Sequence, residues 1–172
     1  LTGQGGDWVL DVASAGDERE LAAGLDLPLD QAALQESGAT LAWYDPGWGY
    51  RKSIQIDHTK VAADQTNFPV LINTTDPNWK STGNGGQVGQ TDGGDFVFTL
   101  ADGTTKLDHE IESYDPATGQ LVAWVRLPTL SSSANTSLNL YFGNAGAANQ
   151  WNPTGVWDAN FKGVWHLKEG TG

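Results

Sequence analysis

The chain has 172 residues, of which 38% are hydrophobic, so it is long enough for one ordinary domain with its own core and a modest extension. Nine basic residues stand against 21 acidic ones, and a net charge of −12 would repel a phosphate backbone, which excludes nucleic acid as an expected partner. The sequence contains neither cysteine nor an apolar run long enough to cross a bilayer, so we expect no disulfide, no thiolate metal site and no membrane insertion.

Residues 1–40 differ in composition from the rest of the chain, because they are rich in Ala, Leu, Asp and Glu. Residues 17–21 and 29–35 carry apolar residues at roughly helical spacing, and the glycine and proline between them keep any helix short. Residues 7–12, Asp-Trp-Val-Leu-Asp-Val, are the one strand-like run. We therefore expect a partly helical N-terminal arm or linker.

Residues 41–160 consist of short β-branched and aromatic runs separated by Gly, Pro, Asn and Asp. In residues 50–57 apolar and polar residues alternate, which turns one face of a strand toward a core. No long helical segments separate the runs. The pattern predicts an all-β domain, an antiparallel and jelly-roll-like β-sandwich. The expected strands are residues 50–57, 68–73, 95–100, 109–114, 121–127 and 137–142, with 164–167 as a further strand beyond the domain.

The most polar expected strand is Asp-His-Glu-Ile-Glu at residues 108–112. Alternation places its acidic residues on one face and His109 on the other. The acidic face would suit a cation or a sugar hydroxyl; alternatively, it faces solvent or neutralises basic residues such as Arg126 across the sheet. Two carboxylates on one strand stand side by side, whereas the acid and base of a glycosidase flank a bond from opposite sides, so the pattern does not favour catalysis.

The usual catalytic motifs are missing from the sequence. It contains no Gly-x-Ser-x-Gly elbow, no phosphate-binding loop and no dinucleotide fingerprint, and its three histidines lie far apart with no zinc-ligand spacing. We therefore expect a protein that is not an enzyme.

Eight tryptophans are available either to fill a core or to offer a flat platform to a sugar ring. Trp124 lies between Ala123 and Val125 in a strand, and we expect it to be buried. Trp79 adjoins the glycine-rich loop 81–94 and is the platform candidate. The predicted ligand-binding residues are Trp79, His109, Glu110, Glu112 and Arg126.

Three aspartates, Asp92, Asp95 and Asp102, cluster around glycines in and just after the long loop. Such a cluster gathers oxygen ligands for calcium, although no EF-hand pattern is present. The alternative is that they are ordinary turn aspartates that accept hydrogen bonds from the nearby backbone. Calcium is the one cofactor that the sequence suggests.

Six ordered blocks of sequence resemble a prokaryotic domain family of unknown function. They are WGYRKSI at 48–54, NFPVLI at 67–72, GDFVFT at 94–99, HEIESYD at 109–115, AWVRLP at 123–128 and LYFGN at 140–144. That family occurs in large secreted or surface proteins, commonly before a laminin-G or concanavalin-like lectin module, and in periplasmic parts of proteins related to the TolQ/ExbB proton channels. The resemblance implies a β-sandwich, an extracytoplasmic location and no enzymatic activity, and it makes residues 161–172 the start of a following lectin-like module or a C-terminal strand.

Two hypotheses follow for a secreted or cell-surface protein. The first is a non-catalytic module for glycan binding or surface adhesion. The alternative is a structural subunit of a surface filament or layer, in which a strand or the arm pairs with a neighbouring subunit, so that the partner is another surface-protein subunit or a second copy of the chain. A glycoside hydrolase and a periplasmic sensor part of a TolQ/ExbB-like complex rank below these two.

Overall fold

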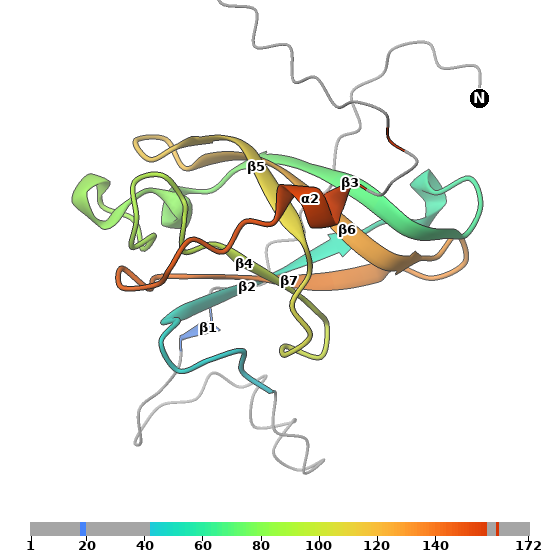
Figure 1. Ribbon diagram of the computed structural model, residues 1–172, viewed down its shortest axis with the longest axis horizontal. Coiled ribbons are helices and arrows are strands. Elements are labelled where there is room, and N and C mark those ends of the chain that lie inside the picture. The colour runs from blue at the N-terminus through green and yellow to red at the C-terminus, as the bar shows by residue number, and fades with distance from the viewer. Residues whose placement is uncertain (1–17, 20–41, 158–160, 162–172) are drawn as a thin grey trace, which may run out of the picture.

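The computed structural model describes residues 18–19, 42–157 and 161, and within these ranges the fold is an antiparallel β-sandwich (Figure 1). One sheet has the strand order β1-β2-β7-β4 and the other β3-β6-β5. The strands are β1 (Glu18–Arg19), β2 (Tyr50–Ile56), β3 (Gln65–Thr75), β4 (Val97–Leu100), β5 (His109–Asp115), β6 (Gln120–Leu130) and β7 (Thr136–Phe142). The prediction of an all-β sandwich is confirmed.

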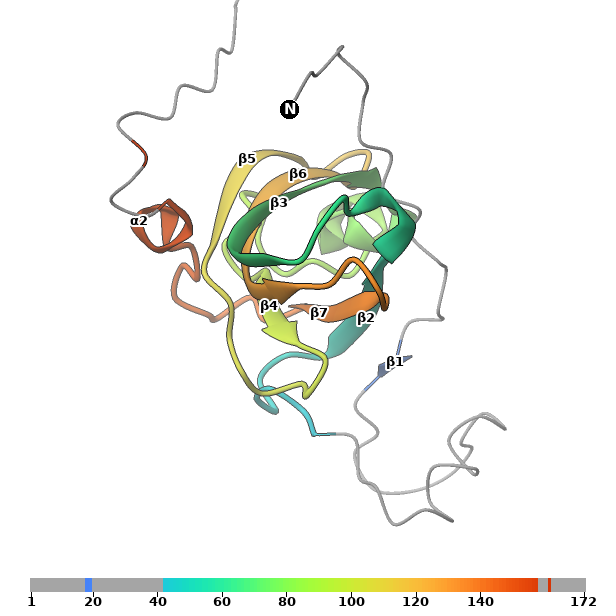
Figure 2. The ribbon, with the colours of Figure 1, turned by 90° about the vertical axis from the view of Figure 1, so that its right-hand side faces the viewer.

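Short helical turns lie between some of these strands and after the last one. They are the 3₁₀ turns η1 (His58–Lys60), η2 (Pro77–Trp79) and η3 (Thr82–Asn84) and the α-helical turn α2 (Pro153–Val156). Seen end-on, the two sheets lie one above the other, with β1 beside β2 and α2 beside β5 (Figure 2). None of the helices in the described ranges is long and apolar enough to span a membrane.

The core between the sheets is made by the alternation predicted from the sequence. In β6 every second residue from Leu121 to Leu127 is fully buried, and Ile54 in β2, Ile72 in β3 and Leu140 in β7 meet them from the other strands. Aromatic rings of Phe96, Phe98 and Phe142 fill one end of the same cluster. Large apolar side chains packed in one continuous core make this the dominant source of stability.

The structure tests the predictions for the N-terminal arm, residues 1–40, at residues 18 and 19 only. Glu18 and Arg19 form an extended pair beside β2, so the helical prediction for residues 17–21 is wrong where the structure describes that segment. A short antiparallel pairing outweighs the weak helical propensity of these residues. The predicted helix at 29–35 and the strand-like runs at 7–12 and 164–167 lie outside the described residues.

Candidate functional site

The predicted polar face lies on the outer surface of the sheet β3-β6-β5. Between the buried residues of β6, Trp124 and Arg126 project to the outside and are partly exposed. Glu110 and Glu112 lie beside them on β5, where alternation places both on the outer side, and the register with β6 shifts between Ile111 and Ser113. The structure therefore brings Glu110, Glu112 and Arg126 onto one face, whereas the expectation that Trp124 is buried is wrong.

Two tryptophans are paired with the two carboxylates. Trp124 Nε1 donates to Glu112 Oε2 at 2.8 Å, and Trp157 Nε1 donates to Glu110 Oε2 at 2.6 Å. The two indole rings have centroids 5.3 Å apart and are tilted by 58°. We call these four residues, with Phe161, the tryptophan face; the ring of Phe161 lies 5.0 Å from Trp157 and the residue is 45% exposed.

Trp157 is held on this face by the turn α2. The Arg126 guanidinium donates to the carbonyl of Gly155 at 2.8 Å and to Asn67 Oδ1 at 3.1 Å. Asn152 Nδ2 donates to Asp108 Oδ1 at 2.7 Å at the start of the same turn. These contacts fix α2 against the sheet, and Trp157 follows it directly. Sequence reasoning missed Trp157, because a contact between residues 47 positions apart leaves no local pattern.

His109 belongs to the core and not to the site. It lies on the opposite side of β5 from the acidic residues, as alternation predicts, but it is 0% exposed and packs 5.2 Å from the ring of Phe98. Its Nδ1 lies 3.4 Å from the carbonyl of Leu107, and its Nε2 has no hydrogen-bond partner. Burial lowers the pKa of His109 from 6.5 to about 4. The prediction that His109 contacts a ligand is therefore wrong.

Trp79 is also buried. It lies in η2 at 0% exposure, with its ring 6.4 Å from Phe96 and its carbonyl accepting from Tyr114 Oη at 2.5 Å. The indole belongs to the same buried core cluster as Val88 of the glycine-rich loop. The prediction of an exposed platform at Trp79 is wrong, whereas Trp124 and Trp157 on the tryptophan face are partly exposed.

Asp95 is a buried carboxylate that binds four backbone amides. Its Oδ2 accepts from the N–H groups of Gly89, Gly143 and Asn144 at 2.8–3.0 Å, and its Oδ1 accepts from Gln90 at 3.1 Å. This arrangement joins the glycine-rich loop to the end of β7. Because several backbone amides already surround both oxygens, Asp95 has a structural role.

The other two predicted calcium ligands are turn aspartates. Asp92 accepts a hydrogen bond from the backbone N–H of Gly94. Asp102 accepts hydrogen bonds from the Thr105 hydroxyl and from the backbone N–H groups of Thr105 and Thr104, and these bonds, the hydroxyl's most of all, lower the pKa of Asp102. Within the described part of the chain, no three acidic or histidine side chains are grouped to hold a metal ion. The prediction of a calcium site at Asp92, Asp95 and Asp102 is wrong, and the alternative of ordinary turn aspartates describes Asp92 and Asp102.

The fold and the face define a β-sandwich domain with an aromatic and acidic outer surface. Residues 92–166 match the family described as a domain of unknown function, DUF2341, which supports the resemblance to an uncharacterised domain family. The matched region begins before β4 and contains β4 to β7, α2 and Trp157, so it includes the whole tryptophan face. No curated protein and no solved structure matches the chain.

Proposed function

We propose that this chain is a non-catalytic extracellular module that binds glycans, and so serves surface adhesion, through the tryptophan face. The observation that supports this proposal is the pair of indole rings 5.3 Å apart on the outer side of a sheet, each beside a carboxylate. The C–H face of a sugar ring packs on an indole, and carboxylate oxygens accept hydrogen bonds from sugar hydroxyls. The resemblance to a family of secreted and surface proteins supports the extracellular location.

The arrangement of Glu110 and Glu112 favours binding over hydrolysis. Both carboxylates project from β5, two residues apart on the same side of the strand. Each accepts a hydrogen bond from an indole N–H of the same face. A glycosidase places its two carboxyl groups on opposite sides of the scissile bond, and two neighbours on one strand do not provide that geometry.

Replacement of either tryptophan should weaken glycan binding. A glycan array with the unaltered chain identifies the best ligand, and titration calorimetry then compares it with Trp124→Ala and Trp157→Ala. We expect each variant to bind at least about tenfold more weakly, because an aromatic contact contributes on the order of 1 kcal/mol beyond its buried area.

Trp43→Ala is the matched control for this experiment. Trp43 is also a partly exposed indole, but it packs against Tyr141 and Arg51 on the outer side of the other sheet. Its removal should leave glycan affinity unchanged. Equal losses for all three variants would contradict the site, and the absence of any glycan ligand would contradict the function.

The position of β1 supports a second candidate function, that of a structural subunit of a surface filament or layer. The arm residues Glu18 and Arg19 pair with Arg51 and Tyr50 at the edge of the sheet, which is the contact that a subunit assembled by arm exchange would use. For such a subunit, light scattering should show a mass that rises with protein concentration, with and without calcium, and deletion of residues 1–40 should abolish the rise. A constant monomer mass, or polymers that persist after the deletion, would contradict assembly through the arm.

A further inference from the structure

A buried ion pair joins the two sheets of the sandwich. Lys52 lies in β2 and Asp76 directly follows β3, so the two residues belong to strands of different sheets. Lys52 Nζ and Asp76 Oδ2 are in direct contact, and the exposed fractions of the two side chains are 7% and 14%. Two charges that leave water lose favourable hydration, and a neutral covalent bond in their place does not carry that cost.

Alternation along β2 directs Lys52 toward the space between the sheets. Lys52, Ile54 and Ile56 occupy every second position of the strand, and all three are buried. In the register with β7, Lys52 lies opposite Leu140, which is fully buried. The amino group therefore approaches the carboxylate from the core side of its sheet.

Asp76 is held in place by backbone contacts. Its N–H donates to the carbonyl of Gly119 at 3.1 Å, and its own carbonyl accepts from Trp79 N at 3.0 Å. A Cβ atom at Gly119, where φ is +78°, would lie 2.0 Å from the carbonyl oxygen of Asp76, so the turn between β5 and β6 packs tightly against this residue. In the side chain, Oδ1 accepts from Asn78 N at 2.9 Å while Oδ2 contacts Lys52. The carboxyl group is thereby fixed between a backbone donor and an amine.

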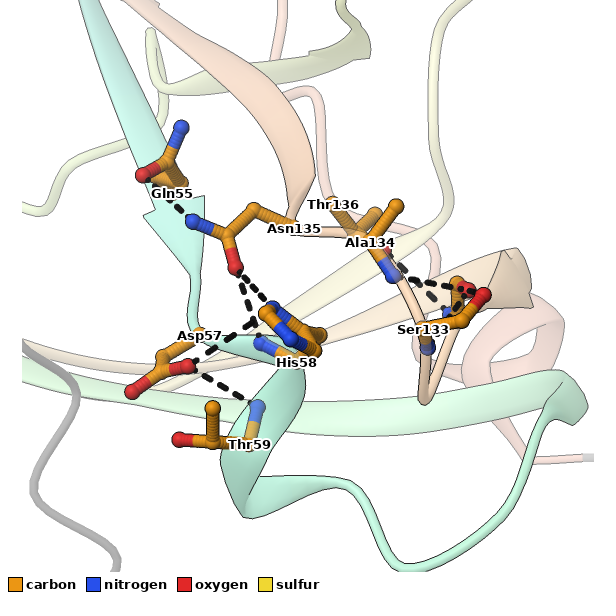
Figure 3. A network of polar contacts seen from close by, with 9 residues as sticks. Gln55, Asp57, His58, Thr59, Ser133, Ala134, Asn135 and Thr136 are labelled. Carbon is orange, nitrogen blue, oxygen red and sulfur yellow. Dashed lines mark hydrogen bonds and ion pairs between the residues drawn. The ribbon is translucent and has the colours of Figure 1, made fainter.

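At the other end of β2, a network of polar contacts fixes the connection between β2 and β3 (Figure 3). Asn135 Oδ1 accepts from the backbone N–H of His58 at 3.0 Å and lies 2.7 Å from the ring Nδ1 of the same histidine. Asn135 Nδ2 donates to Gln55 Oε1 at 2.9 Å. The segment from β2 to β3 is therefore anchored at its bend, and the contact of Lys52 with Asp76 joins its two ends.

We infer that Lys52 and Asp76 form an intramolecular isopeptide bond, which links the two sheets covalently. The ammonium group transfers one proton to the carboxylate, and the amine Nζ then attacks Cγ to form the C–N bond. The tetrahedral intermediate places its negative charge on Oδ1, to which the backbone N–H of Asn78 donates. A second proton passes from Nζ to the Oδ2 hydroxyl group, which leaves as water, and the C=O bond to Oδ1 forms again.

The position of the pair favours this reaction. Contacting groups on a fixed scaffold react as if highly concentrated, and effective molarities reach about 10⁵–10⁸ M in well-oriented intramolecular reactions. The bond closes a ring between residues 24 positions apart, so it restricts the unfolded chain as a disulfide would, in a chain that has no cysteine. The bond involves no residue of the tryptophan face, so the inference does not depend on glycan binding.

The mass of the purified full chain tests the bond. We expect the main species to be lighter than the sequence mass by one molecule of water. Trypsin should then not cleave after Lys52, because its Nζ is acylated, and tandem mass spectrometry should find residues 52–60 joined to residues 61–80, which contain Asp76. A chain of full mass that yields the separate peptides 53–60 and 61–80 would overturn the inference and leave an ordinary ion pair.

Lys52→Arg is the matched variant, because arginine keeps the positive charge beside Asp76 but its guanidinium stays protonated and does not form an amide. We expect this variant to have its full mass and a thermal midpoint about 10 °C below that of the unaltered chain, since its unfolded state loses the constraint of the ring. Lys60→Arg, in the exposed turn η1, should still lose the water and keep the midpoint of the unaltered chain. A loss of water that persists in Lys52→Arg would place the reaction elsewhere and would equally overturn the inference.

Discussion

The free energy of unfolding should fall by about 3 kcal/mol as the pH drops from 6.5 to about 4, because of His109. The imidazole is fully buried, and loss of water around it is the largest cause of its low pKa. The backbone of Leu107 raises the pKa and is the next largest influence, Lys106 lowers the pKa, and the backbone of Phe96 and Asp108 raise it by smaller amounts. In the folded protein, the neutral ring is therefore favoured.

The sign follows from the protons bound in each state. Above pH 6.5 His109 is neutral in both the folded and the unfolded chain, and the full stability is present. As the pH falls below 6.5 the unfolded chain takes up a proton that the folded core refuses until about pH 4, so stability is lost through this interval. Among the described residues, the carboxyl groups with lowered pKa values are Asp57, Asp64, Asp102 and Asp115. The ordinary pKa of each is 3.8, so their contributions to stability change below this interval.

Urea unfolding at a series of pH values measures how the free energy of unfolding changes with pH, and His109→Phe is the matched variant. Phenylalanine fills similar space beside Phe98 and does not titrate, and it leaves no polar atom in place of the unpartnered Nε2. We expect the variant to keep its stability between about pH 7 and pH 4.5, apart from the contributions of other groups. The same pH dependence in both proteins would show that His109 is not responsible.

The sequence predicted the strands well because alternation is a local signal. The buried positions of β6, Leu121 to Leu127, follow the period of two, and so do the inward residues of β2. The same alternation would have placed Trp124 on the outside, since its neighbours Ala123 and Val125 face inward. The prediction that Trp124 is buried was wrong because it relied on the apolar character of tryptophan and not on the position of the residue in the strand.

The prediction that Trp79 is exposed was wrong for a different reason. Its surroundings, Asp76-Pro77-Asn78 and a glycine-rich loop, are typical of a surface turn, and the structure does form a 3₁₀ turn there. The indole packs against Phe96 in a core cluster that also contains Val88, and both residues lie farther along the chain. Tertiary packing of this kind has no local sequence signal, and the same is true of the partners of Asp95.

Replacement of Asp95 by alanine should lower the free energy of unfolding by about 3–5 kcal/mol. The variant leaves four backbone N–H groups without their acceptor in a buried place, those of Gly89, Gln90, Gly143 and Asn144. Each unsatisfied buried donor costs about 1–3 kcal/mol, and relaxation of the loop or entry of water recovers part of the sum. Denaturant unfolding at neutral pH measures the change.

Two further variants separate this role of Asp95 from the effect of losing any turn aspartate. Asp102→Ala removes an acceptor of the Thr104 and Thr105 N–H groups, but that turn is exposed to water, so we expect a loss of about 1 kcal/mol or less. Asp95→Asn keeps one acceptor oxygen but turns an NH₂ group toward backbone donors, so it should lose nearly as much as alanine does. An asparagine variant as stable as the unaltered chain would show that the second carboxylate oxygen is dispensable. Destabilisation by Asp95→Asn, with Asp102→Ala close to the unaltered chain, would establish that the buried carboxylate holds the glycine-rich loop to the end of β7.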